Sequence, residues 1–302
     1  MSSHNKTVII VCGPTATGKT SAAISLAKHF QTRIISADSR QCFKELETGV
    51  ARPSEEELKE VTHYFIASHS IRDNINAAFF EEFSLQKTNE LFQNHDVIVM
   101  VGGTGLYIKA FCEGLDEIPA IDESVRKTIS KEYETRGLEW LQDVIREKDP
   151  EFFAVGEIKN PQRMMRALEV VESTGQSILN FRKNKTEKRG FNIIKIGLEL
   201  SKEELHHNIN SRVDKMIGQG LIEEVSRLIP YKNLNALQTV GYSEIFDYLD
   251  GKKSLDDAIE EIKKNTRQYA KRQMTWFKKD KEIEWFSPKE IKGMVSYVQG
   301  RI

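Results

Sequence analysis

Residues 6–30 read KTVIIVCGPTATGKTSAAISLAKHF. The apolar, β-branched run Lys6–Cys12 is typical of a strand that is buried on both faces. A glycine-bounded turn follows, and the apolar spacing after it predicts a helix from Lys19 to Phe30. The turn, Gly13–Thr20, fits the pattern G-x-x-x-x-G-K-[ST] and lies between a strand and a helix, where that pattern belongs. The segment therefore predicts a phosphate-binding loop at the end of a buried strand.

The residue types of this loop suit a phosphate for separate physical reasons. Its glycines let successive backbone N–H groups curl around a phosphate oxygen, and the following helix adds its positive N-terminus. Lys19 adds a point charge, and the hydroxyl of Thr20 can bind Mg²⁺. The pattern does not identify the molecule that carries the phosphate. The predicted phosphate-binding residues are Gly13, Pro14, Thr15, Ala16, Thr17, Gly18, Lys19 and Thr20.

Further strands are predicted at 33–37, 96–101 and 191–200, with helical patterns between them. Strands that alternate with helices indicate a parallel sheet covered by helices on both faces. Together with the phosphate loop, this pattern predicts an α/β fold of the P-loop NTPase type. Ligands of such folds bind in loops at the carboxyl ends of the strands.

Asp38 directly follows the predicted strand at 33–37. A carboxylate there can face the phosphate loop and accept a proton from a nucleophile. A loop or helix-capping role is the alternative. Most P-loop enzymes that transfer phosphoryl groups hold Mg²⁺ with an acid at the end of a later strand, whereas the strand at 96–101 ends in Gly102-Gly103-Thr104. This ending weakens the prediction of an ordinary ATPase.

The middle of the chain has a different pattern. Helices are predicted at 124–136, 138–148 and 160–173, the last with Asn160 as its N-cap and Pro161 in its first turn. The simplest architecture is a catalytic α/β core at 1–114 and 191–302, interrupted by a helical insertion domain at 115–190.

Composition excludes several classes of protein. The 302 residues include 44 Lys and Arg and 45 Asp and Glu, which gives a net charge of -1 and excludes a uniform polycation. No apolar run approaches the ~18–20 residues of a membrane span, and the N-terminal residues show no signal-peptide pattern. The three cysteines have no paired spacing. A cytoplasmic protein that uses no membrane is expected.

Lys263–Lys281 contains eight basic residues and one acid. Selective binding of a structured polyanion requires such a patch, but the solvated face of a helix with cations near its C-terminus is an equal alternative. Tyr269, Trp276 and Phe277 are interleaved with the cations. They predict either stacking on RNA or packing of the helix on the core.

Arginines on two further predicted helices are candidates for binding an anion. Arg163 and Arg166 lie one turn apart near the start of the helix at 160–173, where cations oppose the helix dipole. They predict a site for an anion or a base edge, and an ion pair with Glu169 is the alternative. Arg212 lies in the middle of a helix, where an exposed arginine paired with an acid is the ordinary interpretation.

Six segments span almost the whole chain: Gly13–Thr20, Asp38–Gln41, Val101–Tyr107, Pro161–Glu169, Val240–Tyr242 and Arg267–Trp276. Together, and in this order, they resemble the tRNA dimethylallyltransferases, also known as the IPP transferase family. Three segments depart from the usual family pattern, and all three lie near the expected substrate channel. They are Cys42-Phe43, Gly49–Pro53 and Thr62-His63-Tyr64.

The resemblance implies transfer of a dimethylallyl group from dimethylallyl diphosphate to N6 of adenosine 37 in tRNA, with Mg²⁺ as cofactor and Thr20 as its ligand. It implies catalytic roles for Asp38 as base, for Thr104, and for Arg212, which reverses the ordinary interpretation of that arginine. The helical insertion would hold the anticodon stem-loop, and a monomer is expected. The implied tRNA-binding residues are Asp38, Ser39, Arg40, Gln41, Thr104, Arg126, Gln162, Arg163, Met164, Met165 and Arg166.

Three alternatives remain open from the residues. A P-loop small-molecule kinase would form ADP from ATP and would not need the insertion. An adenylate isopentenyltransferase would prenylate free AMP, whereas the insertion with Arg163 and Arg166 favours tRNA. An RNA-binding protein without catalysis would carry a relic phosphate loop, and the intact Lys19, Thr20 and Asp38 argue against it.

Overall fold

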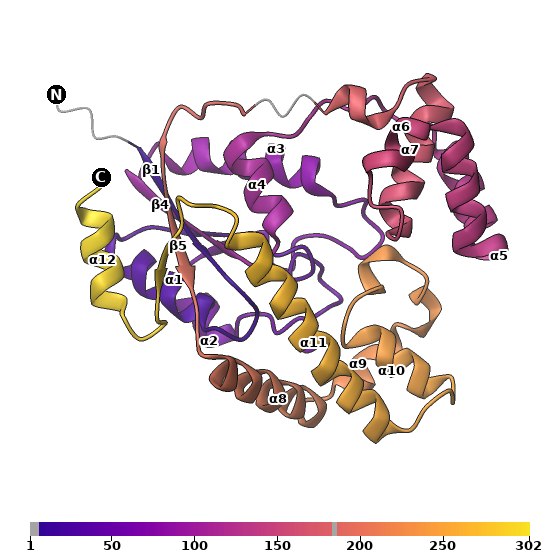
Figure 1. The fold of residues 1–302 in the computed structure, drawn as a ribbon. Coiled ribbons are helices and arrows are strands. Elements are labelled where there is room, and N and C mark those ends of the chain that lie inside the picture. Colours follow the sequence, from indigo (N-terminus) through magenta and orange to yellow (C-terminus); the bar gives the residue numbers. More distant parts are fainter. Residues whose placement is uncertain (1–5, 183–185) are drawn as a thin grey trace. The chain divides into compact units, whose positions relative to one another are not determined.

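One sheet forms the centre of the part of the chain that the structure, a computed structural model, describes: residues 6–182 and 186–302. Its strands are all parallel and lie in the order β3-β2-β4-β1-β5-β6 (Figure 1). The strands are β1 (Thr7–Cys12), β2 (Ile34–Ser36), β3 (His63–Tyr64), β4 (Val97–Gly102), β5 (Asn192–Leu198) and β6 (Glu284–Phe286).

The described residues fall into two units. The first, here called the core unit, extends to Cys112 and resumes at Lys188. The second, the insertion unit, comprises Glu113–Glu187, whereas the sequence pattern placed the insertion at 115–190. The helices that begin in the core unit are α1 (Lys19–His29), α2 (Glu55–Glu60), α3 (Ala77–Leu91), α4 (Gly105–Glu113), α8 (Lys202–Gly218), α9 (Leu221–Arg227), α10 (Tyr242–Leu249), α11 (Leu255–Phe277) and α12 (Ile291–Gln299), with 3₁₀ turns at Ile229–Tyr231 and Asn235–Leu237.

Every residue of β1 is buried, because the strand lies between β4 and β5 and both of its faces are covered. A strand in this position requires a continuous apolar run, and β1 and β4 both have one. The edge strands β3 and β6 are only two and three residues long and lack such a run. For this reason the sequence pattern did not predict them.

Successive side chains of a strand point to opposite faces of the sheet. Ile9 and Val11 pack with residues of α1 and α12 in one apolar cluster, and Val8 and Ile10 pack with residues of α3, α4 and α11 in another. In Figure 1, α1 and α12 lie on one side of the sheet and α3, α4 and α11 on the other. The predicted α/β fold with helices on both faces is thus confirmed.

The ends of two predicted helices have the expected chemistry. The hydroxyl of Ser201 accepts from the backbone N–H of Glu204, whose carboxylate accepts from the N–H of Ser201, so that α8 begins with a capping box. Ser254 caps α11 by accepting from the N–H of Asp257. These caps define the starts of the two long helices that border the sheet's carboxyl edge.

The insertion unit is helical, with α5 (Glu123–Lys148), α6 (Pro150–Val155), α7 (Pro161–Thr174) and a 3₁₀ turn at Ile178–Phe181. Gly137 interrupts α5 with a φ of 76°. The break agrees with the two separate helices expected at 124–136 and 138–148. Asn160 caps α7 through the N–H of Arg163, and Gly175 ends it in the left-handed conformation, both as predicted.

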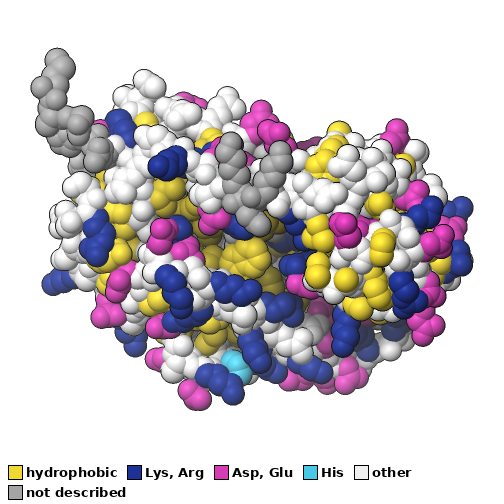
Figure 2. Space-filling view, turned by 45° about the horizontal axis from the view of Figure 1, so that its top comes forward, with side chains coloured by type: hydrophobic (Ala, Val, Ile, Leu, Met, Phe, Trp, Pro, Cys, Tyr) yellow, Lys and Arg dark blue, Asp and Glu magenta, His cyan; other side chains and the backbone are white. Residues whose placement is uncertain are grey.

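Among residues 6–182 and 186–302, no helix has the length and hydrophobicity needed to cross a bilayer. Cys12, Cys42 and Cys112 are all buried, and none of them forms a disulfide within the described residues. Figure 2 shows Lys and Arg side chains interspersed with Asp and Glu over the visible face. This surface agrees with the balanced composition, which excluded a uniform polycation.

Candidate active site

The loop that is predicted to bind phosphate, Gly13–Thr20, follows β1 and runs into α1, the position that the sequence pattern predicts. Gly13 has a φ of +139°, and a Cβ there would lie 2.6 Å from the backbone oxygen of Leu198, so only glycine fits. Gly18 precedes the first helical residue in the left-handed conformation and leaves α1 without a side-chain cap. The N–H groups of the first turn of α1 are therefore available to an anion.

The loop is also closed by its own side chains. The hydroxyl of Thr17 donates to the carbonyl oxygen of Pro14 at 2.8 Å, and Nζ of Lys19 donates to the same oxygen at 2.5 Å. Gly13, Pro14 and Thr17 do not line the pocket, and they contribute to the shape of the loop through the contacts described above. The other predicted loop residues, Thr15, Ala16, Gly18, Lys19 and Thr20, line a pocket.

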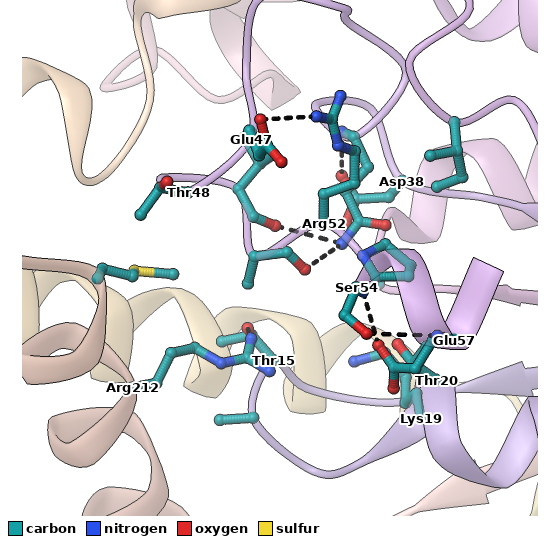
Figure 3. A pocket seen from close by; sticks show the side chains of 18 of the residues that line it. Thr15, Lys19, Thr20, Asp38, Glu47, Thr48, Arg52, Ser54, Glu57 and Arg212 are labelled. Atoms are coloured by element: carbon teal, nitrogen blue, oxygen red, sulfur yellow. Dashed lines mark hydrogen bonds and ion pairs between the residues drawn. The ribbon is translucent and has the colours of Figure 1, made fainter. Parts of the chain in front are cut away.

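This pocket has a volume of about 1620 Å³ and lies at the carboxyl ends of β1, β2 and β4 (Figure 3). Lys19 and Thr20 of α1, Asp38 after β2, and Arg212 of α8 all line it. Nη1 of Arg212 donates to the hydroxyl of Thr15 at 3.0 Å, across 197 positions of sequence. The structure therefore places the phosphate loop, the predicted base and the predicted leaving-group arginine in one cavity.

Lys19 and Arg212 are two cations recessed in the pocket. Neither forms an ion pair with a carboxylate among the described residues. The pKa of Lys19 is lowered to about 8, chiefly by burial and secondly by the charge of Arg212, against an opposing effect of Asp38. Burial also lowers the pKa of Arg212. Partly desolvated cations without a counter-ion favour an anionic ligand at this end of the pocket.

Asp38 has two roles in the structure. Its Oδ1 accepts from the backbone N–H of Arg40 at 2.9 Å and of Gln41 at 3.2 Å, which is the turn-capping role considered as an alternative. Its side chain also lines the pocket that contains Lys19. A carboxylate fixed by its own turn can present its other oxygen to a ligand, so the two interpretations are compatible.

Of the neighbouring predicted residues, Gln41 lines the pocket and Ser39, Arg40 and Thr104 do not. The hydroxyl of Thr104 accepts from the N–H of Ser39 at 3.0 Å and donates to the hydroxyl of Ser39 at 3.3 Å. The structure thus gives Thr104 a contact that holds the turn after Asp38, not a place in the pocket wall. Its catalytic role stays a prediction.

Gln273 of α11 is a site residue that the sequence analysis missed. Its Oε1 accepts from the N–H of Thr15 at 2.9 Å, and its Nε2 donates to the carbonyl oxygen of Gly103 at 2.9 Å. One buried amide therefore bridges the phosphate loop and the loop after β4. A signal was present, because Gln273 occupies a position that the periodicity of α11 reserves for apolar residues such as Ala270 and Phe277.

The aromatic residues of α11 divide between the two predicted roles. Phe277 is buried in the core, as the packing alternative expected. Tyr269 and Trp276 are 37% and 38% exposed, and Tyr269 lines the pocket. The exposed cations Lys271 and Arg272 lie on the same helix, so this part of α11 keeps the basic and aromatic surface that an RNA-binding role requires.

The predicted tRNA-binding residues of the insertion unit are mostly on its surface and are paired with acids. Arg126 and Arg166 both donate to the carboxylate of Glu169, at 3.3 Å and 3.1 Å. Arg163 pairs with Glu157 at 2.5 Å. The ion pair with Glu169, considered as an alternative for Arg166, is thereby present, and Gln162 is exposed beside it.

Two members of that set require correction. Met164 is fully buried and Met165 is 8% exposed, and both pack in the apolar core of the insertion unit. Their side chains pack between α7 and the rest of the insertion unit and are not accessible to RNA. The prediction that these two side chains contact tRNA is therefore wrong, because helical periodicity turns them to the face opposite Gln162 and Arg163.

The donor set of the pocket is suited to one kind of metal site. In the described ranges, no group of three or more His, Cys, Asp or Glu side chains could form a protein cage around a metal ion. Thr20 and Asp38 both supply oxygen to the pocket. Mg²⁺ commonly binds through few protein oxygens together with substrate phosphates and water. The residues thus fit Mg²⁺ that arrives with a diphosphate.

Comparisons with known proteins agree with this pocket. The model of the family "IPP transferase" matches residues 41–280. The tRNA dimethylallyltransferase of Cytophaga hutchinsonii is 47% identical over 302 residues, 100% of this chain and 99% of that protein. That of Christiangramia forsetii is 49% identical over 296 residues, 98% of each chain. The chain belongs to the IPP transferase family.

Solved structures of the family have the same fold. The crystal structure of the full-length tRNA isopentenylpyrophosphate transferase of Bacillus halodurans has a TM-score of 0.72 at 32% identity, over 98% of this chain and 96% of that one. The family transfers a dimethylallyl group to adenosine 37 of tRNA, so the chain is a transferase that modifies tRNA. This membership displaces the kinase and the non-catalytic alternatives.

Proposed function

We propose that the pocket transfers the dimethylallyl group of dimethylallyl diphosphate to N6 of adenosine 37, with Asp38 as the base. The observation that supports this most directly is one cavity that contains two recessed cations, Lys19 and Arg212, and a carboxylate. In the reaction the bond from the allylic carbon to the diphosphate oxygen breaks, and a bond from that carbon to N6 forms. The diphosphate leaves with the electron pair, and Asp38 accepts the N6 proton.

Stabilising the departing diphosphate is the larger task. An allylic carbon tolerates positive charge, so charge that develops on the leaving group dominates the barrier. Residues of the loop, Lys19 and Arg212 line one pocket, where the loop N–H groups and the two cations would stabilise that charge. Mg²⁺ bound through Thr20 and the diphosphate would neutralise part of the same charge.

The proposed role of Asp38 is to activate the acceptor, the N6 amine of adenosine 37. The exocyclic amine of adenine is a poor nucleophile because its lone pair is delocalised into the ring, so removal of its proton assists attack. The adenine must leave its stack to enter a pocket at the strand ends. Bases in a single-stranded RNA loop are free to do this, which favours an anticodon loop over a paired stem.

One prediction concerns the ionisation of Lys19. Because the pKa of Lys19 is about 8, this side chain loses its proton above that pH in the free protein, and diphosphate binding must then restore the proton. The dissociation constant of dimethylallyl diphosphate, measured by titration calorimetry without tRNA, is expected to be flat from about pH 7 to 8, where the diphosphate is fully ionised, and to rise up to ~tenfold per pH unit above pH 8. The weaker binding of Lys19→Met should show no such rise, and a flat wild-type profile to pH 10 would contradict the assignment.

A second prediction concerns tRNA binding by the insertion unit. Exposed arginines that contact phosphates make RNA affinity depend on salt. Arg163→Ala is expected to weaken tRNA binding about tenfold and to reduce the slope of log affinity against log salt by ~1. Its affinity for dimethylallyl diphosphate should not change. Arg136→Ala removes another exposed arginine of the same unit that is paired with an acid, Glu132, and serves as the control.

If Arg163→Ala and Arg136→Ala weaken tRNA binding equally, then the effect is general electrostatics and Arg163 makes no specific contact with tRNA.

The proposal extends to the basic surface of α11, where Lys271 and Arg272 would contact RNA phosphates. We also propose that the protein is a monomer. With tRNA as substrate, we propose the cytoplasm as its location.

Mass spectrometry of nucleosides tests the function. The protein is incubated with dimethylallyl diphosphate, Mg²⁺ and unmodified tRNA, and the tRNA is digested to nucleosides. Formation of N6-(dimethylallyl)adenosine is expected, with little product when Mg²⁺ is omitted. AMP replaces tRNA in a parallel reaction, and faster prenylation of AMP would establish the adenylate isopentenyltransferase alternative instead.

A further inference from the structure

A buried carboxylate on α9 holds one wall of the pocket by its backbone. Glu224 is 5% exposed, and its oxygens accept from the N–H groups of Glu47 at 3.2 Å, Thr48 at 2.8 Å and Gly49 at 3.3 Å. The hydroxyl of Tyr242, which is fully buried at the start of α10, donates to the same carboxylate. Four donors therefore converge on one side chain that lies outside the catalytic set.

The segment held in this way, residues 47–53, is here called the wall loop. Apart from Gly49, all of its residues line the pocket (Figure 3). Arg52 pairs with Glu47 at 3.0 Å and closes the loop on itself. Ala51 has a φ of 47°, a conformation that a non-glycine residue keeps only when its surroundings impose it. The wall loop is thus a strained segment with a defined anchor.

The wall loop is connected in turn to the proposed base. Nε2 of Gln41 donates to the carbonyl oxygens of Val50 at 3.2 Å and Ala51 at 3.0 Å. The backbone N–H of Gln41 donates to Oδ1 of Asp38. A displacement of the wall loop would therefore move Gln41, and with it the turn that orients the Asp38 carboxylate.

The ring of Tyr242 packs so closely against Gly49 of the wall loop that no side chain fits at that position. A Cβ on Gly49 would lie 2.5–2.7 Å from the ring and hydroxyl of Tyr242. Tyr242 belongs to the segment Val240-Gly241-Tyr242, one of the six that resemble the family, and the reaction described above gives that segment no task. Its place in the structure is behind the pocket wall.

We propose that Glu224 and Tyr242 are positioning residues, which hold the wall loop so that Gln41 and Asp38 face the acceptor adenine. The inference rests on the proposed function, because the quantity it controls is the rate of prenyl transfer. Neither side chain lies at the phosphate loop. Their loss should therefore lower kcat and leave the binding of dimethylallyl diphosphate intact.

Hydrogen exchange tests the anchor without reference to activity. Glu224→Gln leaves one oxygen and an N–H₂ group opposite four donors, and Tyr242→Phe removes one donor at constant shape. Both variants are expected to speed amide exchange at 47–49, measured by mass spectrometry of a peptide that spans the wall loop. The expected increase is at least tenfold for Glu224→Gln and smaller for Tyr242→Phe, with the sheet strands unchanged.

Steady-state kinetics tests the consequence. A misplacement of about 1 Å at a reacting group can cost ~10²-fold in rate. We expect kcat to fall about that much in Glu224→Gln and ~tenfold in Tyr242→Phe, with KM for dimethylallyl diphosphate within ~twofold of the wild type. Gly49→Ala displaces the wall loop from the other side and should give the same pattern, which keeps the test valid if Glu224→Gln does not fold.

Thr32→Val is the matched control. The hydroxyl of Thr32 is buried and donates to the carbonyl oxygen of Val97 at 2.5 Å, at the amino ends of β2 and β4 and therefore away from the pocket. This variant loses one buried hydroxyl hydrogen bond, as Tyr242→Phe does, and should keep kcat and exchange at 47–49. If wild-type protein prenylates tRNA while Glu224→Gln and Gly49→Ala keep kcat and exchange unchanged, the positioning role is wrong. If wild-type protein fails to prenylate tRNA, the proposed function is wrong and the exchange result still judges the anchor.

Discussion

Asp38→Asn is expected to lower kcat for prenyl transfer to tRNA by ~10²–10⁴-fold, the range that a general base contributes. The asparagine oxygen can still accept from the N–H groups of Arg40 and Gln41, as Oδ1 of Asp38 does. The turn after β2 should therefore survive the change, and only the capacity to accept a proton is lost. Single-turnover assays with bound tRNA measure the chemical step directly.

Binding of tRNA and of dimethylallyl diphosphate to Asp38→Asn should stay within ~threefold of the wild type, because neither depends on proton acceptance. Asp38→Ala, which also removes the turn cap, should be less active still. Asp73→Asn alters another aspartate that caps a turn, at the N–H of Ser70 and outside the pocket lining, and serves as control. Undiminished turnover of Asp38→Asn would remove Asp38 as the base.

Arg212→Gln is expected to lower kcat by ~10²–10³-fold, comparable to the loss of one oxyanion donor elsewhere. The glutamine can still reach toward Thr15 but has no charge to offer the departing diphosphate. Product inhibition by inorganic diphosphate should weaken as well, whereas tRNA affinity should not change. Rapid-quench kinetics with an excess of enzyme separates the chemical step from product release.

Lys202→Gln removes a cation from the first position of the same helix, α8, outside the pocket lining. This control should keep wild-type kcat. A second comparison is Arg212→Lys, which keeps the charge but not the two-pronged geometry of a guanidinium. Equal activity of Arg212→Gln and the wild type would show that Lys19, the loop and Mg²⁺ suffice for the leaving group.

The sequence was most informative where local chemistry determines the structure. A strand buried on both faces needs a continuous apolar run, and the phosphate loop needs glycines at fixed spacing, so β1, the loop and α1 could be predicted directly. Caps at Ser201 and Asn160 are equally local. The edge strands β3 and β6 depend on neighbours in the sheet and have no pattern of their own.

The site could be predicted only in part, because several of its contacts are remote in sequence. Arg212 alone suggests an exposed ion pair, and only its placement over Thr15 shows it to be a pocket cation. Glu224 accepts hydrogen bonds from wall-loop residues that lie 175 to 177 positions earlier in the sequence. The periodicity of a sequence does not predict a contact between residues so far apart. The prediction of tRNA contacts for Met164 and Met165 failed because the motif covers consecutive residues. Consecutive residues of a helix point in different directions, and these two point into the core of the insertion unit.

Gln273 has a consequence for the order in which the molecule matures. A ribosome releases the N-terminal strand and its glycine turn first, yet the amide that ties this turn to Gly103 is encoded 258 positions after Thr15. Until α11 is synthesised, a nascent chain therefore has the glycine turn but lacks the two hydrogen bonds through which Gln273 connects it with Gly103. Synthesis of α11 supplies the tie that completes the catalytic cavity.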